Sequence, residues 1–266
     1  MIDRNLVTRL RDVKFCLLSP AVGTGAVNHH RVALTHAEGW NHWHLSLGAH
    51  RLRSLFKNLT ASRAPAADDI DPRDGPCWQI IAFAAGAVVG AARLRVYDSP
   101  YVVKAEELFR FCDISIVDPT TRENVSDAFE AYAQRQMRAD GRFFLAGGLA
   151  VCRERQRTGL GPVLGLAVNA LVETMGIHGG CLAGPQKMGP LEMYQRMGGS
   201  PLALNSVELP AFPCANHGHL SRVLALRTFR YEPHLADTIS TLRDWVTQTP
   251  VIVPKVHERS HADDLH

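Results

Sequence analysis

The stretch FFLAGGLAVCRERQRTGLGPVLGLAVNALVETMG, residues 143–176, organises the fold of this chain. Residues 143–151 are apolar and uncharged, which predicts a buried central strand rather than an edge strand. A polar burst follows and ends in a glycine-containing turn at 158–161. Beyond the turn, apolar residues recur at helical spacing and predict a helix with a buried face. These helical positions are Leu164, Val168, Leu171 and Met175.

The turn itself has the features of an anion site. Gly159 and Gly161 let backbone N–H groups face a ligand without interference from a Cβ atom. Pro162 is expected at the first helical position, where its fixed φ suits the helix and its missing N–H costs nothing. Unbonded amides and the helix dipole attract anions at such an N-terminus. The pattern therefore predicts a binding site large enough for a pyrophosphate.

Two motifs resemble those of one superfamily. The hexapeptide QRTGLG at 156–161 resembles the Q/R-x-x-G-x-G/A signature of GNAT N-acetyltransferases, and MYQRMG at 193–198 resembles that family's F/L-Y-x-K-x-G element. Their order and separation make the pair more specific than either motif alone. The resemblance implies a GNAT-type α/β fold, with a central mixed sheet splayed between its fourth and fifth strands and helices on both faces.

The resemblance also implies an activity: an acetyl group would pass from acetyl-CoA to a primary amine of a small molecule by direct attack. The donor would be held by Leu149, Ala150, Val151, Gln156, Arg157, Thr158, Gly159, Leu160, Gly161 and Lys187. A backbone N–H near 149–151 would face the thioester oxygen. Arg153, Arg155 and Arg157 would add positive charge toward the phosphates. Lys187 stands where the family usually has asparagine and would meet a phosphate as a point charge.

Tyr194 is the candidate catalytic acid. A phenol with a pKa of about 10 can donate a proton to a thiolate whose conjugate acid has a pKa of about 8.5. The alternative is a half-buried aromatic residue on an amphipathic helix. The motif at 156–161 favours the catalytic role.

The general base is left open by the sequence. The predicted strand 143–151 has no Asp, Glu or His, so a base would come from elsewhere. The candidates are Glu106, Glu107, Asp113, His217 and His219. Residues 107–111 also resemble the E-x-x-R-F pattern of acyl-homoserine-lactone synthases, although a surface ion pair of Glu107 with Arg110 explains the same residues. The alternatives are therefore longer acyl donors, on coenzyme A or a carrier protein, and a non-catalytic module that binds coenzyme A.

The rest of the chain fits one domain at 1–253, with an N-terminal extension, an insertion at about 98–142 and a flexible tail at 254–266. Apolar runs at 77–84 and 87–97 predict a β-hairpin. The insertion is expected to hold a strand at 108–117 and a helix that begins at the capping box 120–123. Further expectations are helices within 30–63, at 190–197 and at 233–248, and strands at 180–183 and within 204–231.

Composition limits the class of protein. The chain has 266 residues, 46% of them hydrophobic, and a formal net charge of +3, which gives no reason to expect nucleic acid as a partner. No apolar run is long enough for a bilayer, so no membrane partner is expected. Six cysteines without a C-x-x-C pair indicate buried thiols of a reducing cytoplasm. The histidines form no H-E-x-x-H motif, so no metal is expected. The assembly is left open, with a homodimer as one alternative.

Overall fold

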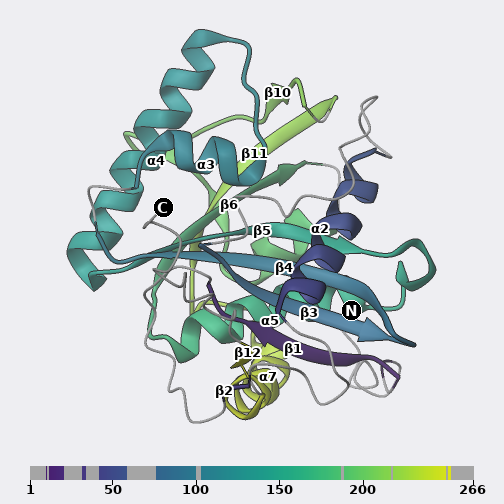
Figure 1. The fold of residues 1–266 in the computed structure, drawn as a ribbon. Helices are drawn as coiled ribbons and strands as arrows, with labels where there is room; N and C mark the ends of the chain where they lie inside the picture. The colour runs from purple at the N-terminus through teal and green to yellow at the C-terminus, as the bar shows by residue number, and fades with distance from the viewer. Residues whose placement is uncertain are drawn as a thin grey trace, which may run out of the picture.

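A computed structural model describes residues 10, 12–20, 32–33, 42–58, 76–99, 103–186, 189–216, 218–249 and 251–252. A ten-stranded mixed sheet in the order β10-β11-β6-β5-β4-β3-β1-β12-β2, with β7 paired to β11, runs through the molecule (Figure 1). Its strands are β1 (Lys14–Leu18), β2 (Val32–Ala33), β3 (Trp78–Ala84), β4 (Ala87–Tyr97), β5 (Phe143–Val151), β6 (Gly179–Pro185), β7 (Ser200–Pro201), β10 (Phe212–Cys214), β11 (His219–Arg227) and β12 (Val251–Ile252). A separate hairpin pairs β8 (Ala203–Leu204) with β9 (Val207–Glu208).

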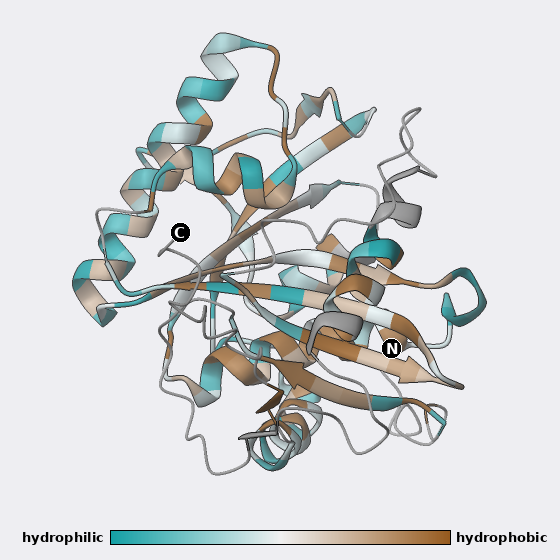
Figure 2. Cartoon of the chain, in the orientation of Figure 1, coloured by the Kyte–Doolittle hydropathy of each residue, from teal (hydrophilic) through white to brown (hydrophobic). Residues whose placement is uncertain are grey.

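The centre of the sheet is the hairpin β3–β4 and the strand β5, as the apolar runs predicted. The hairpin turns at Ala85 and Gly86, which have φ angles of 48° and 75°. Two successive positive φ values are typical of the tight turn that matches strand twist. In Figure 2 much of the brown colour lies along the strands of the sheet, whereas α4 (Pro119–Asp140) is largely teal.

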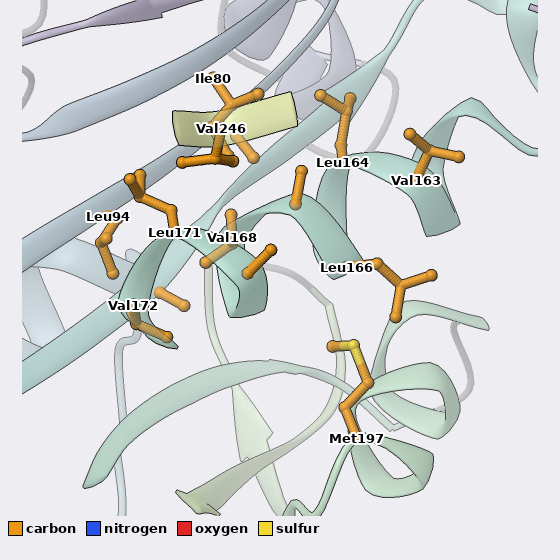
Figure 3. Packing of buried hydrophobic residues seen from close by; sticks show 14 of the residues in the cluster. Ile80, Leu94, Val163, Leu164, Leu166, Val168, Leu171, Val172, Met197 and Val246 are labelled. Carbon is orange, nitrogen blue, oxygen red and sulfur yellow. The ribbon is translucent and has the colours of Figure 1, made fainter. Parts of the chain in front are cut away.

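One face of the sheet is covered by α5 (Leu160–Thr174), α6 (Gly189–Arg196) and α7 (Ala236–Gln248). The four predicted positions of α5 are buried, but so is nearly every other residue from Val163 to Glu173. Figure 3 shows the reason: α5 lies between Ile80 and Leu94 of the sheet, Val246 of α7 and Met197 just after α6. A helix enclosed on all sides needs apolar residues all round rather than a single stripe.

The opposite face is covered by α2 (His42–Asn58), α3 (Ala105–Cys112) and α4. The prediction of a strand at 108–117 is wrong, because the first half of this segment belongs to α3. Ala105, Leu108 and Phe109 are buried at helical spacing, and Asp113 ends the helix with a φ of 59°. Helix α4 begins two residues earlier than a capping box at 120–123 would give, because the Asp118 carboxylate caps it by accepting from the N–H of Thr121 at 2.8 Å.

Strands β5 and β6 run parallel and pair only at Phe144–Gly180 and Leu145–Cys181. Beyond that point β5 continues to Val151 and β6 to Pro185 without pairing to each other. We call the opening between these two strand ends the splay. It is the feature that the GNAT resemblance implied, so the predicted fold class is confirmed.

The far edge of the sheet was not predicted. The two-residue strand β12 lies between β1 and β2 and runs parallel to both. Val32 and Ala33 are therefore extended, although the helical pattern was predicted to begin at about residue 30. All six cysteines are free thiols, four of them buried. Lys187, His217 and the predicted tail at 254–266 lie outside the described residues.

Candidate functional site

The turn after β5 delivers unbonded amides to the start of α5. A short 3-10 helix, η2 (Arg153–Arg155), leads into the turn, and the Thr158 hydroxyl closes it by donating to the Arg155 carbonyl at 2.7 Å. Gly159 caps α5 with a φ of 93°, a region that only glycine enters without strain. The first helical bond runs from the Val163 N–H to the Gly159 carbonyl, at 3.1 Å. In this part of the chain the N–H groups of Gly159, Leu160 and Gly161 meet no protein acceptor.

Pro162 is the third residue of α5, two positions later than predicted. The helix begins earlier because Gly159 already turns the chain into its axis. The missing N–H of Pro162 still falls among the first-turn donors that no helical carbonyl reaches, so the proline costs α5 no hydrogen bond. A Cβ on Gly161 would lie 3.8 Å from Cγ2 of Val151. The first turn of α5 is therefore beside the free end of β5.

The three arginines predicted to face phosphates differ in their surroundings. Arg155 pairs with Asp12, just before β1; its Nη1 lies 3.2 Å from Oδ1, and a second, shorter contact joins Nη2 to Oδ2. The Arg155 guanidinium holds the pKa of the exposed Asp12 carboxyl below its usual range. Arg155 therefore anchors the turn, while Arg153 and Arg157 are exposed beside it. The role of Asp12 could not be read from sequence, because Asp12 and Arg155 are far apart in the chain.

Strand β5 contains a bulge at the site where a backbone donor was predicted. Ala91 pairs with Ala150, but the next pair is Arg93 with Gly147, so Gly148 and Leu149 together oppose one residue of β4. Gly148 has a φ of 59°. Such a bulge bends a strand and redirects the peptide groups that follow. Leu149 is thus part of the bulge, and Ala150 and Val151 follow it on a stretch of β5 that pairs with β4 but not with β6. Two adjacent glycines inside an apolar strand were the sequence signal for it.

Tyr194 of α6 is 5% exposed. Its hydroxyl oxygen lies 3.4 Å from where a Cβ on Gly165 of α5 would stand, and the described chain gives it no hydrogen-bond partner. Burial raises the pKa of the phenol well above its ordinary value, and the nearby Cys112 thiol raises it further. The phenol therefore stays protonated at neutral pH.

The candidate bases are not gathered at the splay. The Glu107 carboxylate, with a side chain 15% exposed, contacts Arg95 Nη1 at 2.6 Å, accepts from the Tyr97 hydroxyl at 3.2 Å and pairs with Arg110. The predicted ion pair with Arg110 is present, but it belongs to a half-buried group of four side chains that joins α3 to β4.

The other described acidic and imidazole candidates lie at the surface or in another hydrogen bond. Asp113 accepts from the Asn216 side chain at 3.4 Å, and Glu106 and His219 are exposed. Within the described ranges, no three His, Cys, Asp or Glu side chains come together where they could hold a metal ion. None of the described helices is long and apolar enough to span a bilayer.

No family model matches the sequence, and no curated protein is found as a relative. Among solved structures, the chain is similar to BjaI, a CoA-dependent acyl-homoserine lactone synthase with SAM and isopentyl-CoA. The two share 16% identity over 92% of this chain and 95% of that chain, with a TM-score of 0.49.

Two further structures represent other groups. FeeM, an N-acyl amino acid synthase from uncultured soil microbes, is 12% identical over 68% of this chain and 84% of its own, with a TM-score of 0.45. The ribosomal-protein-S18-alanine N-acetyltransferase from Escherichia coli is 12% identical over 73% and 93%, with a TM-score of 0.41.

Proposed function

We propose that this protein is an acyltransferase that moves an acyl group, acetyl in the first instance, from coenzyme A to the primary amine of a small molecule. One observation carries the proposal. The unbonded amides in the first turn of α5 lie beside Val151 of β5, and the hydroxyl of Tyr194, for which no hydrogen bond is found, lies against Gly165 of the same helix. A thioester with a long polar arm and a pyrophosphate needs donors at both places.

The donor would lie along the splay. Its pyrophosphate would accept hydrogen bonds from Gly159, Leu160 and Gly161, where the helix dipole also favours negative charge. Hydrogen bonds to a charged partner each contribute about 1.5–3 kcal/mol. The arm would run between β5 and β6, whose facing edges are unpaired beyond Leu145 and Cys181. An extended chain gains backbone hydrogen bonds at such an edge.

The chemistry then needs few side chains. The amine nitrogen attacks the thioester carbonyl, and the oxygen that gains negative charge meets a backbone amide within 149–151. When the tetrahedral intermediate collapses, the carbon–sulfur bond breaks and the leaving sulfur takes the proton of the Tyr194 hydroxyl. The amine loses its own proton to solvent water. The phenolate of Tyr194 regains a proton from water once the products leave.

Ligand-dependent thermal unfolding tests the donor site first. A ligand at 100 times its Kd stabilises the folded state by about 2.7 kcal/mol, which shifts the unfolding midpoint measurably. We expect a shift with acetyl-CoA that the pair Gly159→Asp and Gly161→Asp abolishes. Gly141→Asp is the control, because Gly141 also has a positive φ (70°) and open space around it but lies at the other end of β5.

The panel should also contain free coenzyme A and longer acyl-CoAs. A larger shift of the unfolding midpoint with a longer acyl-CoA than with acetyl-CoA would indicate that the donor carries a longer acyl group. The proposed reaction would stay the same. A shift together with no acyl transfer to any amine would instead indicate a binding module. No shift with any coenzyme A species would remove the proposed donor site.

A further inference from the structure

Arg93 is a buried cation that contacts the bulge of β5. The residue is 3% exposed, and its side chain lies against Gly148. A Cβ on Gly148 would stand 2.9 Å from both Cγ and Nε of Arg93 and 3.0 Å from its Cδ. Real Cβ atoms do not approach other atoms this closely, so Arg93 leaves Gly148 no room for a side chain. The bulge and the arginine fit each other.

The far end of Arg93 is fixed by α3. Its Nη2 donates to the carbonyl of Phe111 at 2.6 Å, and its guanidinium carbon lies 4.7 Å from the centre of the Phe111 ring. The same ring covers the other glycine of the bulge, because a Cβ on Gly147 would stand 3.1 Å from Cε1 of Phe111. We call this set, Arg93 with Phe111, Gly147 and Gly148, the Arg93 clamp.

The clamp is supported from the other side by α2. Gln79 of β3 is the cross-strand neighbour of Arg93 and is 1% exposed. Its side-chain amide donates to the Ser46 hydroxyl at 3.1 Å and accepts from Arg53 at 3.3 Å. A row of buried polar side chains thus runs from α2 across β3 and β4 to the bulge. Desolvating a guanidinium is costly, so stability alone does not call for a charge here.

From this geometry we propose that Arg93 is a positioning residue that fixes the β5 bulge, so that the amides after it point into the splay. The inference rests on the proposed function, since those amides are the ones that would meet the thioester carbonyl. In this proposal Arg93 acts through Gly148 and Phe111 rather than on the donor itself. The planar guanidinium covers a ring and donates at the same time, which a lysine ammonium cannot do.

The first test uses the free protein. Backbone hydrogen exchange is measured for the segment 146–152 in Arg93→Met, in Arg93→Lys and in the control Arg122→Met. Arg122 also lies over a phenylalanine of α3, Phe109 at 5.4 Å, but it is exposed. We expect exchange at least about ten-fold faster in Arg93→Met, an intermediate increase in Arg93→Lys and no change in the control. Exchange rates in both Arg93 variants equal to those of the unmodified protein would overturn the inference. If Arg93→Met does not fold, the result for Arg93→Lys decides.

The second test reads the consequence for the donor. The carbonyl carbon of acetyl-CoA, labelled with carbon-13, should change its NMR shift on binding because amides donate to its oxygen. In the Arg93 variants this shift should return toward its value in free solution, while the Kd for acetyl-CoA changes less than about three-fold, since the turn at 156–161 is intact. A carbonyl chemical shift in the Arg93 variants equal to that in the unmodified protein would also overturn the inference. No acetyl-CoA binding by the unmodified protein would contradict the proposed function instead, and the exchange experiment would still decide the role of Arg93.

Discussion

The hydroxyl oxygen of Tyr194 lies 3.4 Å from where a Cβ on Gly165 would stand. Helix α6 thus approaches α5 so closely that the phenol is buried, yet the described chain offers its hydroxyl no acceptor. The proton of this hydroxyl is therefore available to a ligand that can accept it, as a leaving thiolate does.

Tyr194→Phe should therefore lower the rate of acyl transfer without unfolding the protein. We expect kcat to fall about ten-fold or more, since a positioned acid contributes at least that much, and the Kd for the donor to stay nearly the same. Steady-state kinetics and calorimetric binding measure the two quantities. Tyr132→Phe is the matched control, because Tyr132 is a buried phenol that donates to the Leu226 carbonyl at 2.6 Å, away from the splay. Equal kcat in Tyr194→Phe and the unmodified protein would remove Tyr194 from the mechanism.

The pH dependence of turnover tests the same hydroxyl in another way. Burial raises the pKa of Tyr194 above its ordinary value of about 10, so the phenol keeps its proton throughout the neutral and mildly alkaline range. The profile of kcat should rise as the amine loses its proton, and no decline from ionisation of the phenol should appear up to a pH of about 10. A decline near pH 9 that disappears in Tyr194→Phe would show that the phenol ionises earlier than its burial implies.

The ion pair of Asp12 with Arg155 holds the donor turn against the segment before β1. Asp12→Asn should weaken donor binding by at most about five-fold, because exposed ion pairs contribute little. The unfolding midpoint should hardly change for the same reason. The arginine lowers the pKa of Asp12, so the stabilising effect of the pair is present above the ordinary aspartate pKa and is lost as the pH falls through the lowered value. Donor Kd measured at pH 7 in both proteins checks the prediction, and a complete loss of binding would contradict it.

The strand, turn and helix at 143–176 could be predicted because each depends on nearby residues. The apolar run gives β5, the glycine at 159 gives the turn, and the periodic residues give α5. The motif at 193–198 also located Tyr194 on a helix. Its burial beside Gly165, however, depends on how α6 packs on α5, which no local pattern encodes.

The misassigned segment at 108–117 shows a second limit. Leu108, Phe109 and Phe111 are consistent with a strand or a helix, since short apolar runs are ambiguous. The structure resolves the ambiguity through contacts far along the chain, where Phe111 covers Gly147 and its carbonyl accepts from Arg93. The strand β12 is a third case, because two residues carry no periodicity and their place between β1 and β2 is set by the rest of the sheet.

The buried Glu173 near the end of α5 connects three parts of the fold. Its Oε1 accepts from the Asn169 side chain at 3.0 Å and from the Phe229 N–H at 3.1 Å, and its Oε2 lies 3.5 Å from Nη1 of Arg243 in α7. Burial nevertheless raises the pKa of this carboxyl above its ordinary value, and these three partners only oppose the effect. The folded protein therefore binds the proton of Glu173 more tightly than the unfolded chain does.

A raised pKa fixes the sign of the pH effect. The contribution of Glu173 to stability is fully present below the ordinary glutamate pKa of about 4.3 and is lost as the pH rises through the raised value. As the pH rises from about 4 to 8, the Glu173→Gln variant should therefore gain unfolding free energy relative to the unmodified protein. In the protein that keeps Glu173, Arg243→Met should increase this loss of stability at high pH. The substitution removes a positive charge that opposes the effect of burial on the pKa of Glu173. Denaturant titrations across this pH range measure both effects, and a change in favour of the unmodified protein would show that the three partners outweigh burial.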